Sequence, residues 1–258
     1  MNKIMLSNNI SITNDNYEIN NNIVNIKKDG DYIFEYNKDI NKITYNFKEN
    51  INVNILEISV DNNLDNNITY NLLENTSVSI SKFYKNKKVK EIVNINLLEV
   101  NSNINYNFSN ISNNKEQYKI IINHLNKLTK SNIKNKILAK NNSNITIDLD
   151  SIVKKDKIKC SLNQETRAIV FDKEKVNIKP NMYIECDDIE AKHSAVIGKF
   201  KDEEIFYLMT RGIPKEESIE LLSESFLFSN LTFDKEEITN LINKYWRWKK
   251  WIEKTLKW

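Results

Sequence analysis

From about residue 10 to residue 200, apolar and polar residues alternate in short runs such as "NITYNLLE", "SVSISKFY" and "EIVNINLLEV". Polar, asparagine-rich segments separate these runs. A period of two places successive side chains on opposite faces of a β-strand, so the pattern predicts many short strands in series. No helical pattern separates the runs, which argues against the crossover helices of a doubly wound sheet.

A series of short strands can bury one face by closing into a barrel, by forming a sandwich or by stacking as the rungs of a coil. The regular shortness of strands and turns favours the coil, but the pattern alone supports a sandwich about equally well. Glycine occurs only 3 times in 258 residues. We therefore expect asparagine, which tolerates positive φ better than most residues, to supply many of the turn conformations.

After Lys199 the apolar period becomes helical. Asp202 is expected to cap a first helix, whose glutamates favour the positive end of the helix dipole. Gly212 suits the left-handed position at its end, and Pro214 then opens a second helix. The chain is thus divided into a β core, residues 1–200, and a C-terminal helical domain, residues 201–258.

A third helix is expected at 235–257, where Asp234 and Glu237 have the spacing of a capping box. One face of this helix carries Ile238, Leu241, Ile242, Tyr245 and Ile252, and tryptophans at 246, 248, 251 and 258 widen it. A basic helix with tryptophan could lie on an anionic membrane. Such a stripe is more typical of packing against the β core or a partner.

Charge and composition exclude little. A net charge of +3 and a pI near 8.5 are too weak to indicate a nucleic-acid partner. No segment has the roughly 18 consecutive apolar residues of a membrane-spanning helix, and no signal peptide is evident, so we expect a cytoplasmic protein without membrane insertion. Two cysteines do not form a disulfide framework, which agrees with a reducing compartment.

Residues 178–222, "IKPNMYIECDDIEAKHSAVIGKFKDEEIFYLMTRGIPKEESIELL", resemble the C-terminal signature of the SufB/SufD family, the scaffold subunits of the SUF iron–sulfur cluster assembly machinery. Two weaker segments of the family are matched in the same order by residues 124–138 and 163–172. The resemblance covers about residues 124–228. Residues 1–120 and the tryptophan-rich tail carry no motif of the family.

The resemblance implies a right-handed parallel β-helix with a C-terminal α-helical region, and a helical hairpin that caps one end of the coil. It also implies a docking surface for an ABC-type ATPase, SufC, at residues 203–228. The residues expected to bind this partner are Phe206, Tyr207, Arg211, Gly212, Ile213 and Pro214. The aromatic residues could instead belong to the core, since at least one face of the first helix is expected to be buried.

The sequence departs from the family at two motifs. Where the family has Cys-Ser-His-Gly, this chain has "AKHS", which keeps only His193. Glu165 stands where SufB-type chains carry the cysteine of a Gln-Cys-Asp segment. Because both thiolates are missing, the chain resembles SufD. His193 would then be a transient iron or cluster ligand at the SufB interface, or would only form a hydrogen bond there.

Other candidate residues have simpler interpretations. On one continuous strand Cys186 would face away from His193, so Cys186 is expected to be a buried, inert thiol, and Cys160 is a weaker candidate ligand still. Adjacent aspartates at 187 and 188 would point apart, which disfavours a calcium site. His124 is explained equally well by burial and hydrogen bonding. Gln164 and Arg167 match the family and are expected to lie in a turn between rungs or at an interface.

The most favoured function is therefore a non-enzymatic SufD-like scaffold subunit that pairs with a SufB-like chain and docks a SufC-like ATPase. It would bind no permanent cofactor and would share a transient cluster at the subunit interface. ATP-driven closure of two SufC subunits would shift the two β-helices and expose that site. The chain has no phosphate-binding loop of the form G-x-x-x-x-G-K-[ST], so nucleotide chemistry must come from the partner.

Two alternatives remain. The first is a minimal scaffold in which a second copy of the chain replaces SufB, although the loss of the SufB cysteine speaks against it. The second is a β-helix enzyme that acts on polysaccharides. Such an enzyme would be expected to carry a secretion signal and a groove of carboxylates.

Overall fold

The computed structural model describes residues 3–6, 10–36 and 40–246. In this part of the chain the strands form two sheets. The first sheet, here called sheet A, consists of β1 (Lys3–Leu6), β5 (Gly30–Tyr36), β7 (Asn52–Val60), β9 (Ser77–Lys85), β11 (Asn103–Ser112), β13 (Lys130–Ala139), β15 (Cys160–Val170) and β17 (Ile189–Gly198).

The second sheet, sheet B, contains the remaining strands. In order of chain position they are β2 (Ser11–Thr13), β3 (Tyr17–Asn20), β4 (Ile23–Ile26), β6 (Lys42–Phe47), β8 (Asn63–Leu72), β10 (Lys88–Leu97), β12 (Lys115–His124), β14 (Asn144–Val153) and β16 (Lys175–Ile184).

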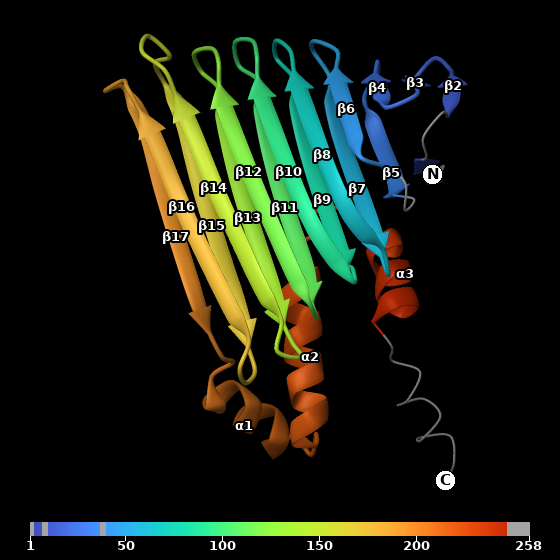
Figure 1. Cartoon of the computed structure of the whole chain (residues 1–258), viewed down its shortest axis with the longest axis vertical. Helices are drawn as coiled ribbons and strands as arrows, with labels where there is room; N and C mark the ends of the chain where they lie inside the picture. Colours follow the sequence, from blue (N-terminus) through green and yellow to red (C-terminus); the bar gives the residue numbers. More distant parts are fainter. Residues whose placement is uncertain (1–2, 7–9, 37–39, 247–258) are drawn as a thin grey trace.

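Consecutive strands from β4 onward alternate between the two sheets. Among these strands, neighbours within one sheet are parallel. One strand of each sheet therefore makes one rung of a coil, and the rungs stack side by side (Figure 1). The structure confirms the parallel β-helix and excludes the sandwich that the pattern had left open.

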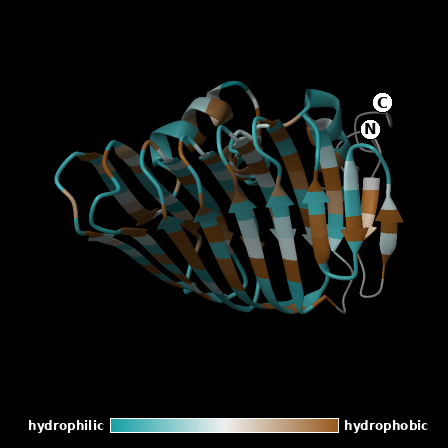
Figure 2. Cartoon of the chain, turned by 90° about the horizontal axis from the view of Figure 1, so that it is seen from above, coloured by the Kyte–Doolittle hydropathy of each residue, from teal (hydrophilic) through white to brown (hydrophobic). Residues whose placement is uncertain are grey.

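The alternation of apolar residues produces continuous columns inside the coil. In sheet A, for example, Ile55 pairs with Ile80, Ile80 with Tyr106, and Tyr106 with Ile133. All four side chains are buried. Figure 2 shows the resulting alternation of hydrophobic and hydrophilic bands along the strands. Because each rung covers its neighbours, burial is continuous along the coil axis.

Asparagine has two roles in the coil. Six of the ten non-glycine residues with positive φ in the described ranges are asparagines, as the scarcity of glycine predicted: Asn21, Asn50, Asn75, Asn101, Asn141 and Asn142. On sheet B a second set forms a ladder, in which each side-chain amide donates to the Oδ1 atom one rung before it. The ladder consists of Asn25, Asn46, Asn71, Asn96 and Asn123.

The two ends of the coil differ. At the N-terminal end, β2, β3 and β4 pair in an antiparallel arrangement that extends sheet B beyond β4. At the other end, β16 pairs only with β14, and β17 pairs only with β15. The last rung therefore leaves one unpaired strand edge in each sheet among the described residues.

The three helices are α1 (Asp202–Thr210), α2 (Lys215–Phe228) and α3 (Lys235–Tyr245). The end of α2 packs through Phe226, Leu227 and Phe228 on the outer face of sheet A, in a cluster that includes Ile58, Phe83 and Leu138. The predicted cap is therefore wrong: α2 packs on β11 and β13 at the side of the coil, α1 packs on α2, and the last rung stays open (Figure 1). The outer face of sheet A is apolar here, so packing against it buries the apolar end of α2.

The helix ends agree only partly with the sequence. Asp202 is the first residue of α1 rather than its cap, which is Lys201; the Lys201 amide donates to Glu204. Gly212 has φ +85°, the left-handed conformation that was expected after α1. Asp234 caps α3 by accepting from the amides of Glu236 and Glu237. The face of α3 that carries Leu241 packs in the outer cluster, whereas Ile252, Trp248, Trp251 and Trp258 lie outside the described residues.

Candidate functional site

His193 lies near the middle of β17, the last strand of sheet A. It pairs in register with Gln164, which is buried and donates through Nε2 to Ser151 Oγ at 2.7 Å and to the Asn181 carbonyl at 3.2 Å. Both acceptors belong to the opposite sheet, so Gln164 points into the coil. His193 therefore continues an interior column, and it is exposed because no further rung covers it.

The rest of the last rung is also exposed. Val196 and Ile197 on β17 retain 53% and 49% of their accessible surface, and Tyr183 and Ile184 on β16 retain 53% and 37%. Ile197 and Ile184 pair with Ala168 and Val153 of the preceding rung, which are buried, whereas Val196 and Tyr183 pair with the half-buried Arg167 and Ile152. The inward apolar side chains of Ile197 and Ile184 and two free strand edges thus share the open end of the coil with His193.

Glu165 does not accompany His193. It is exposed on β15 and pairs with Ser194, one position out of phase with the column of His193. The strand places these two side chains on opposite faces of sheet A. The position where the resemblance puts the SufB cysteine therefore points away from the interior in this chain.

The two cysteines are not on the strand of His193. Cys160 begins β15 and is buried. Cys186 lies in the turn between β16 and β17, so the alternation argument that separated it from His193 does not apply. Cys186 is half-buried rather than fully buried, which corrects the prediction of an enclosed thiol.

Asp187 and Asp188 share this turn and are exposed. They were expected on a strand, but the chain turns here to enter the last strand. Among the described residues, no group of three or more histidine, cysteine, aspartate and glutamate side chains could hold a metal ion. His193 would thus need ligands from outside this part of the chain to bind iron.

His124 has the buried, hydrogen-bonded position that the sequence allowed. Its Nδ1 lies 2.7 Å from Thr129 Oγ1 and its Nε2 lies 2.9 Å from Ser131 Oγ. Burial lowers the pKa of this imidazole to about 4, so His124 is neutral near pH 7. Gln164 and Arg167 both lie within β15, so the prediction that they occupy a turn between rungs is wrong. The Arg167 guanidinium instead stacks over the Phe226 ring of α2 at 5.5 Å.

The α1–α2 hairpin presents the expected docking residues to solvent. Phe206 and Tyr207 retain 66% and 58% of their accessible surface, and none of the residues of α1 is buried. The expectation of a buried face on α1 is therefore wrong; Ile205 and Leu208 are only half-buried. At the end of α1, Arg211 Nη2 donates to the Tyr207 hydroxyl at 3.2 Å. Arg211, Gly212 and Pro214 are exposed, and Ile213 is half-buried.

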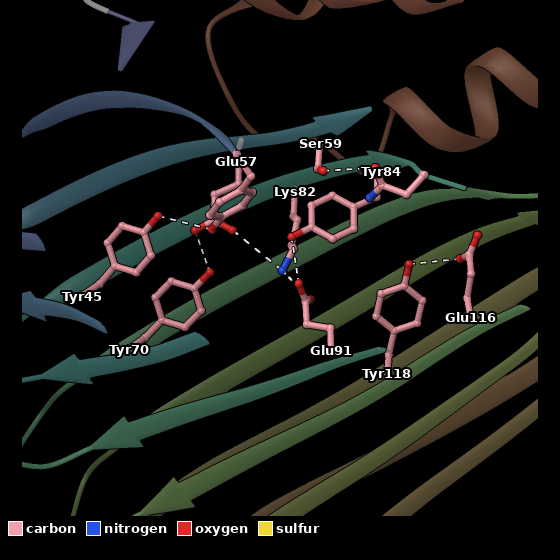
Figure 3. A network of polar contacts seen from close by, with 11 residues as sticks. Tyr45, Glu57, Ser59, Tyr70, Lys82, Tyr84, Glu91, Glu116 and Tyr118 are labelled. Atoms are coloured by element: carbon pink, nitrogen blue, oxygen red, sulfur yellow. Dashed lines mark hydrogen bonds and ion pairs between the residues drawn. The ribbon is translucent and has the colours of Figure 1, made fainter. Parts of the chain in front are cut away.

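The sequence analysis missed a charged network inside the coil. Lys82 Nζ lies 2.6 Å from Glu91 Oε1 and 3.8 Å from Glu57 Oε2, and all three side chains are buried (Figure 3). Tyr70 donates to Glu57 at 2.6 Å, and Tyr84 donates to Glu91 at 2.8 Å. Burial raises the pKa of Glu57. The available signal was a charged residue at an inward position of an otherwise apolar alternation, as in "VSISKFY".

A second acidic site consists of a third carboxylate, Glu116, which lies in the interior near the turn between β11 and β12. Its Oε2 atom accepts from Asn110 at 2.6 Å. The same atom accepts from Tyr118 at 3.0 Å (Figure 3). In the described part of the chain it forms no ion pair, and burial raises its pKa from 4.5 to about 7. Both acidic sites are closed by packed side chains. We therefore assign them to the stability of the coil rather than to chemistry on a ligand.

None of the helices in the described ranges is long and apolar enough to cross a membrane. Comparison with known proteins identifies short similar regions in several relatives. The SufD iron–sulfur cluster assembly protein of Bacillus subtilis is 37% identical over 70 residues, which is 27% of this chain and 16% of that protein. A SufBD family protein of Pyrococcus horikoshii is 37% identical over 59 residues, 23% of this chain and 13% of that protein.

SufD of Escherichia coli is 37% identical over 51 residues, 20% of this chain and 12% of that protein. The aligned segments thus span less than a fifth of each of these relatives. The family model described as "SUF system FeS cluster assembly, SufBD core domain" matches far more of the chain, residues 41–226. This chain therefore belongs to the SufB/SufD family of SUF-system iron–sulfur cluster assembly proteins.

Proposed function

We propose that this chain is a SufD-like scaffold subunit, which acts without enzymatic chemistry of its own in a SUF complex of the cytoplasm. The open last rung carries the proposal. It combines two unpaired strand edges, exposed apolar side chains and an inward-facing histidine in one surface. Such a surface suits the addition of strands from a second chain, which would pair the free edges and bury the apolar residues.

The proposed partner is a SufB-like chain. In a complex joined through the last rung, His193 would face the partner from the interior column of this coil. A neutral imidazole is a competent ligand for ferrous iron. The described residues contain no cluster of metal-binding side chains that could complete the coordination of iron at His193. The remaining ligands, thiolates above all, would therefore come from the partner. The cluster would be a transient cargo of the interface.

The second proposed partner is a SufC-like ABC ATPase that docks on α1 and the turn to α2. The exposed ring of Phe206 and the exposed Tyr207–Arg211 pair support this assignment. Aromatic and arginine side chains are typical anchors of protein interfaces. The hairpin also contacts sheet A through α2, so a force applied to it would reach the coil directly and could shift the last rung against a partner.

The test is anaerobic purification of the tagged chain from its own organism, with mass spectrometry of the partners and quantification of iron and sulfide in the same fraction. Recovery of an ABC ATPase with a cysteine-bearing SufB-like chain is the expected result. Recovery of the ATPase with two copies of this chain and no SufB-like chain would replace the heterodimer by a self-pairing scaffold. Recovery of neither partner would contradict the proposed function.

A further inference from the structure

The two cysteine side chains of the chain converge on one backbone oxygen. Cys160 Sγ lies 3.1 Å from the Lys157 carbonyl oxygen, and Cys186 Sγ lies 3.5 Å from the same atom. Both are free thiols. Since each sulfur is in contact with the same oxygen, the two thiols are near neighbours although they belong to different rungs.

Stacked turns produce this proximity. The turn at 185–188 stacks on the turn at 154–159. Two backbone hydrogen bonds join them: the Glu185 amide donates to the Val153 carbonyl at 3.0 Å, and the Lys159 amide donates to the Asp188 carbonyl at 2.6 Å. The turn at 154–159, which is the longer of the two, brings the Lys157 carbonyl oxygen into contact with both sulfurs. Cys186 also packs in a small apolar cluster that contains Cys160 and Leu162.

The two thiols differ in access to solvent. Cys160 retains 2% of its accessible surface, and its sulfur lies 3.2 Å from Thr129 Oγ1. Cys186 is half-buried in a turn whose other residues, Glu185, Asp187 and Asp188, are exposed. A dissolved oxidant therefore meets Cys186 before it meets Cys160.

We propose that Cys160 and Cys186 form a redox-active dithiol, in which the Cys186 thiolate attacks a small disulfide such as oxidised glutathione and Cys160 then closes an intramolecular disulfide. In the first step the Cys186 thiolate forms a mixed disulfide and releases one glutathione thiolate. In the second step the Cys160 thiolate attacks the Cys186 sulfur and releases the other. The two thiol protons pass to the two glutathione products, and no other oxidant is required.

The disulfide would act on the last rung. It would join the start of β15 to the turn that leads into β17, the strand of His193. This rung has no neighbour on its outer side, so a covalent tie restricts its motion more than it would in the middle of the coil. Both sulfurs contact the Lys157 carbonyl oxygen, so closure requires this oxygen to move aside and the exposed turn at 185–188 to shift as the two side chains rotate.

The rate should depend on pH. Burial, followed by the nearby Cys160, raises the pKa of the Cys186 thiol. Only the thiolate attacks a disulfide, so the reaction should be slow near neutral pH and accelerate in alkaline solution. This behaviour fits a site that stays reduced under ordinary cytoplasmic conditions and responds to sustained oxidation.

The test treats the reduced full-length protein with oxidised glutathione under anaerobic conditions and follows the intact mass and the peptide map. Wild type should lose the mass of two hydrogens and yield a peptide pair linked through Cys160 and Cys186. Cys160→Ser should keep one glutathione on Cys186, because no second thiol displaces it. Cys186→Ser should react much more slowly than wild type.

A second measurement has its main readout on wild type and does not depend on the folding of the single variants. Amide hydrogen exchange of wild type, reduced and oxidised, should show slower exchange in β17 after oxidation, and the Cys160→Ser/Cys186→Ser double variant should show no change. A lasting glutathione adduct on wild type without the linked peptide would overturn the proposal. Equal reaction rates for wild type and Cys186→Ser would overturn it as well.

Discussion

The ammonium group of Lys82 lies 2.6 Å from Glu91 Oε1 in the interior of the coil, where neither side chain reaches solvent. Glu57 approaches the same ammonium from the other side at 3.8 Å, so one cation serves two carboxylates. Burial raises the pKa of Glu57, which relieves the excess of negative charge by favouring its protonated form. A buried ion network of this kind stabilises the folded protein only when all of its charged side chains are present.

Lys82→Met should therefore destabilise the protein strongly, by about 3–5 kcal/mol, because it leaves the Glu91 carboxylate buried without a cation. Urea unfolding followed by circular dichroism measures the change. Lys90→Met is the matched control, since the Lys90 side chain is 63% exposed. Adding Glu91→Gln to Lys82→Met should recover part of the loss. An equal effect of the interior and the exposed substitution would contradict the role of the network.

The sequence predicted the strands because alternation is a local property, and the family resemblance then selected the coil. It did not reveal that Glu57, Lys82 and Glu91 meet, because their contact depends on which rung lies beside which. The partial exposure of Cys186 escaped prediction for a related reason: the number of residues in each turn decides how the turns stack. The exposure of α1 follows from the packing of α2 along the coil, which local periodicity does not encode.

Glu116→Gln should change the pH dependence of stability. The pKa of Glu116 is about 7 in the folded protein against 4.5 ordinarily, so between these values the folded state binds more protons than the unfolded state. Wild type should therefore lose stability as the pH rises from 4.5 to 7, by up to roughly 3 kcal/mol from this group. The variant, which cannot ionise, should lack this loss.

Thermal unfolding of wild type and Glu116→Gln between pH 5 and pH 8 tests this prediction. The difference between the two proteins should shift in favour of the variant as the pH rises. His124 titrates in the opposite sense, since its lowered pKa makes wild type lose stability as the pH falls from 6.5 towards 4. Because both proteins contain His124, the difference between them isolates Glu116. A difference that does not vary with pH would contradict the assignment.

The contribution of each asparagine in the sheet B ladder to the free energy of unfolding should depend on whether it lies inside the ladder or at its end. Asn71 donates to Asn46 at 2.9 Å and accepts from Asn96 at 2.8 Å, whereas Asn123 at the end of the ladder only donates. Asn71→Ala breaks two side-chain hydrogen bonds and Asn123→Ala breaks one. At about 1 kcal/mol for each bond, the interior substitution should cost about twice as much. Chemical unfolding of the two variants gives the ratio, and equal costs would contradict it.

His193→Ala should abolish or strongly reduce iron–sulfur cluster assembly while it leaves the fold unchanged. The side chain is exposed at the open end of the coil, so its removal should change the free energy of unfolding by less than about 0.5 kcal/mol. Lys192→Ala is the control. Lys192 is next to His193 on β17, but it pairs with Asn163, so its side chain lies on the other face of sheet A. Cluster content of the purified complex and growth of a depletion strain give the two readouts. Normal maturation with the alanine at 193 would remove this histidine from the site.

Arg211→Glu should weaken docking of the ATPase. Arg211 contacts only the exposed Tyr207 ring and hydroxyl among the interactions that the structure shows for its side chain, so reversal of its charge should leave the hairpin folded. A cation at the margin of an interface contributes to the rate of association and to its salt dependence. We expect about a ten-fold loss of affinity, roughly 1.4 kcal/mol, measured by calorimetry against the ATPase at low salt. Lys215→Glu reverses an exposed charge at the start of α2 and is the matched control. If both substitutions reduce affinity equally, the effect reports the overall charge of the hairpin, and the turn at Arg211 is not the specific contact.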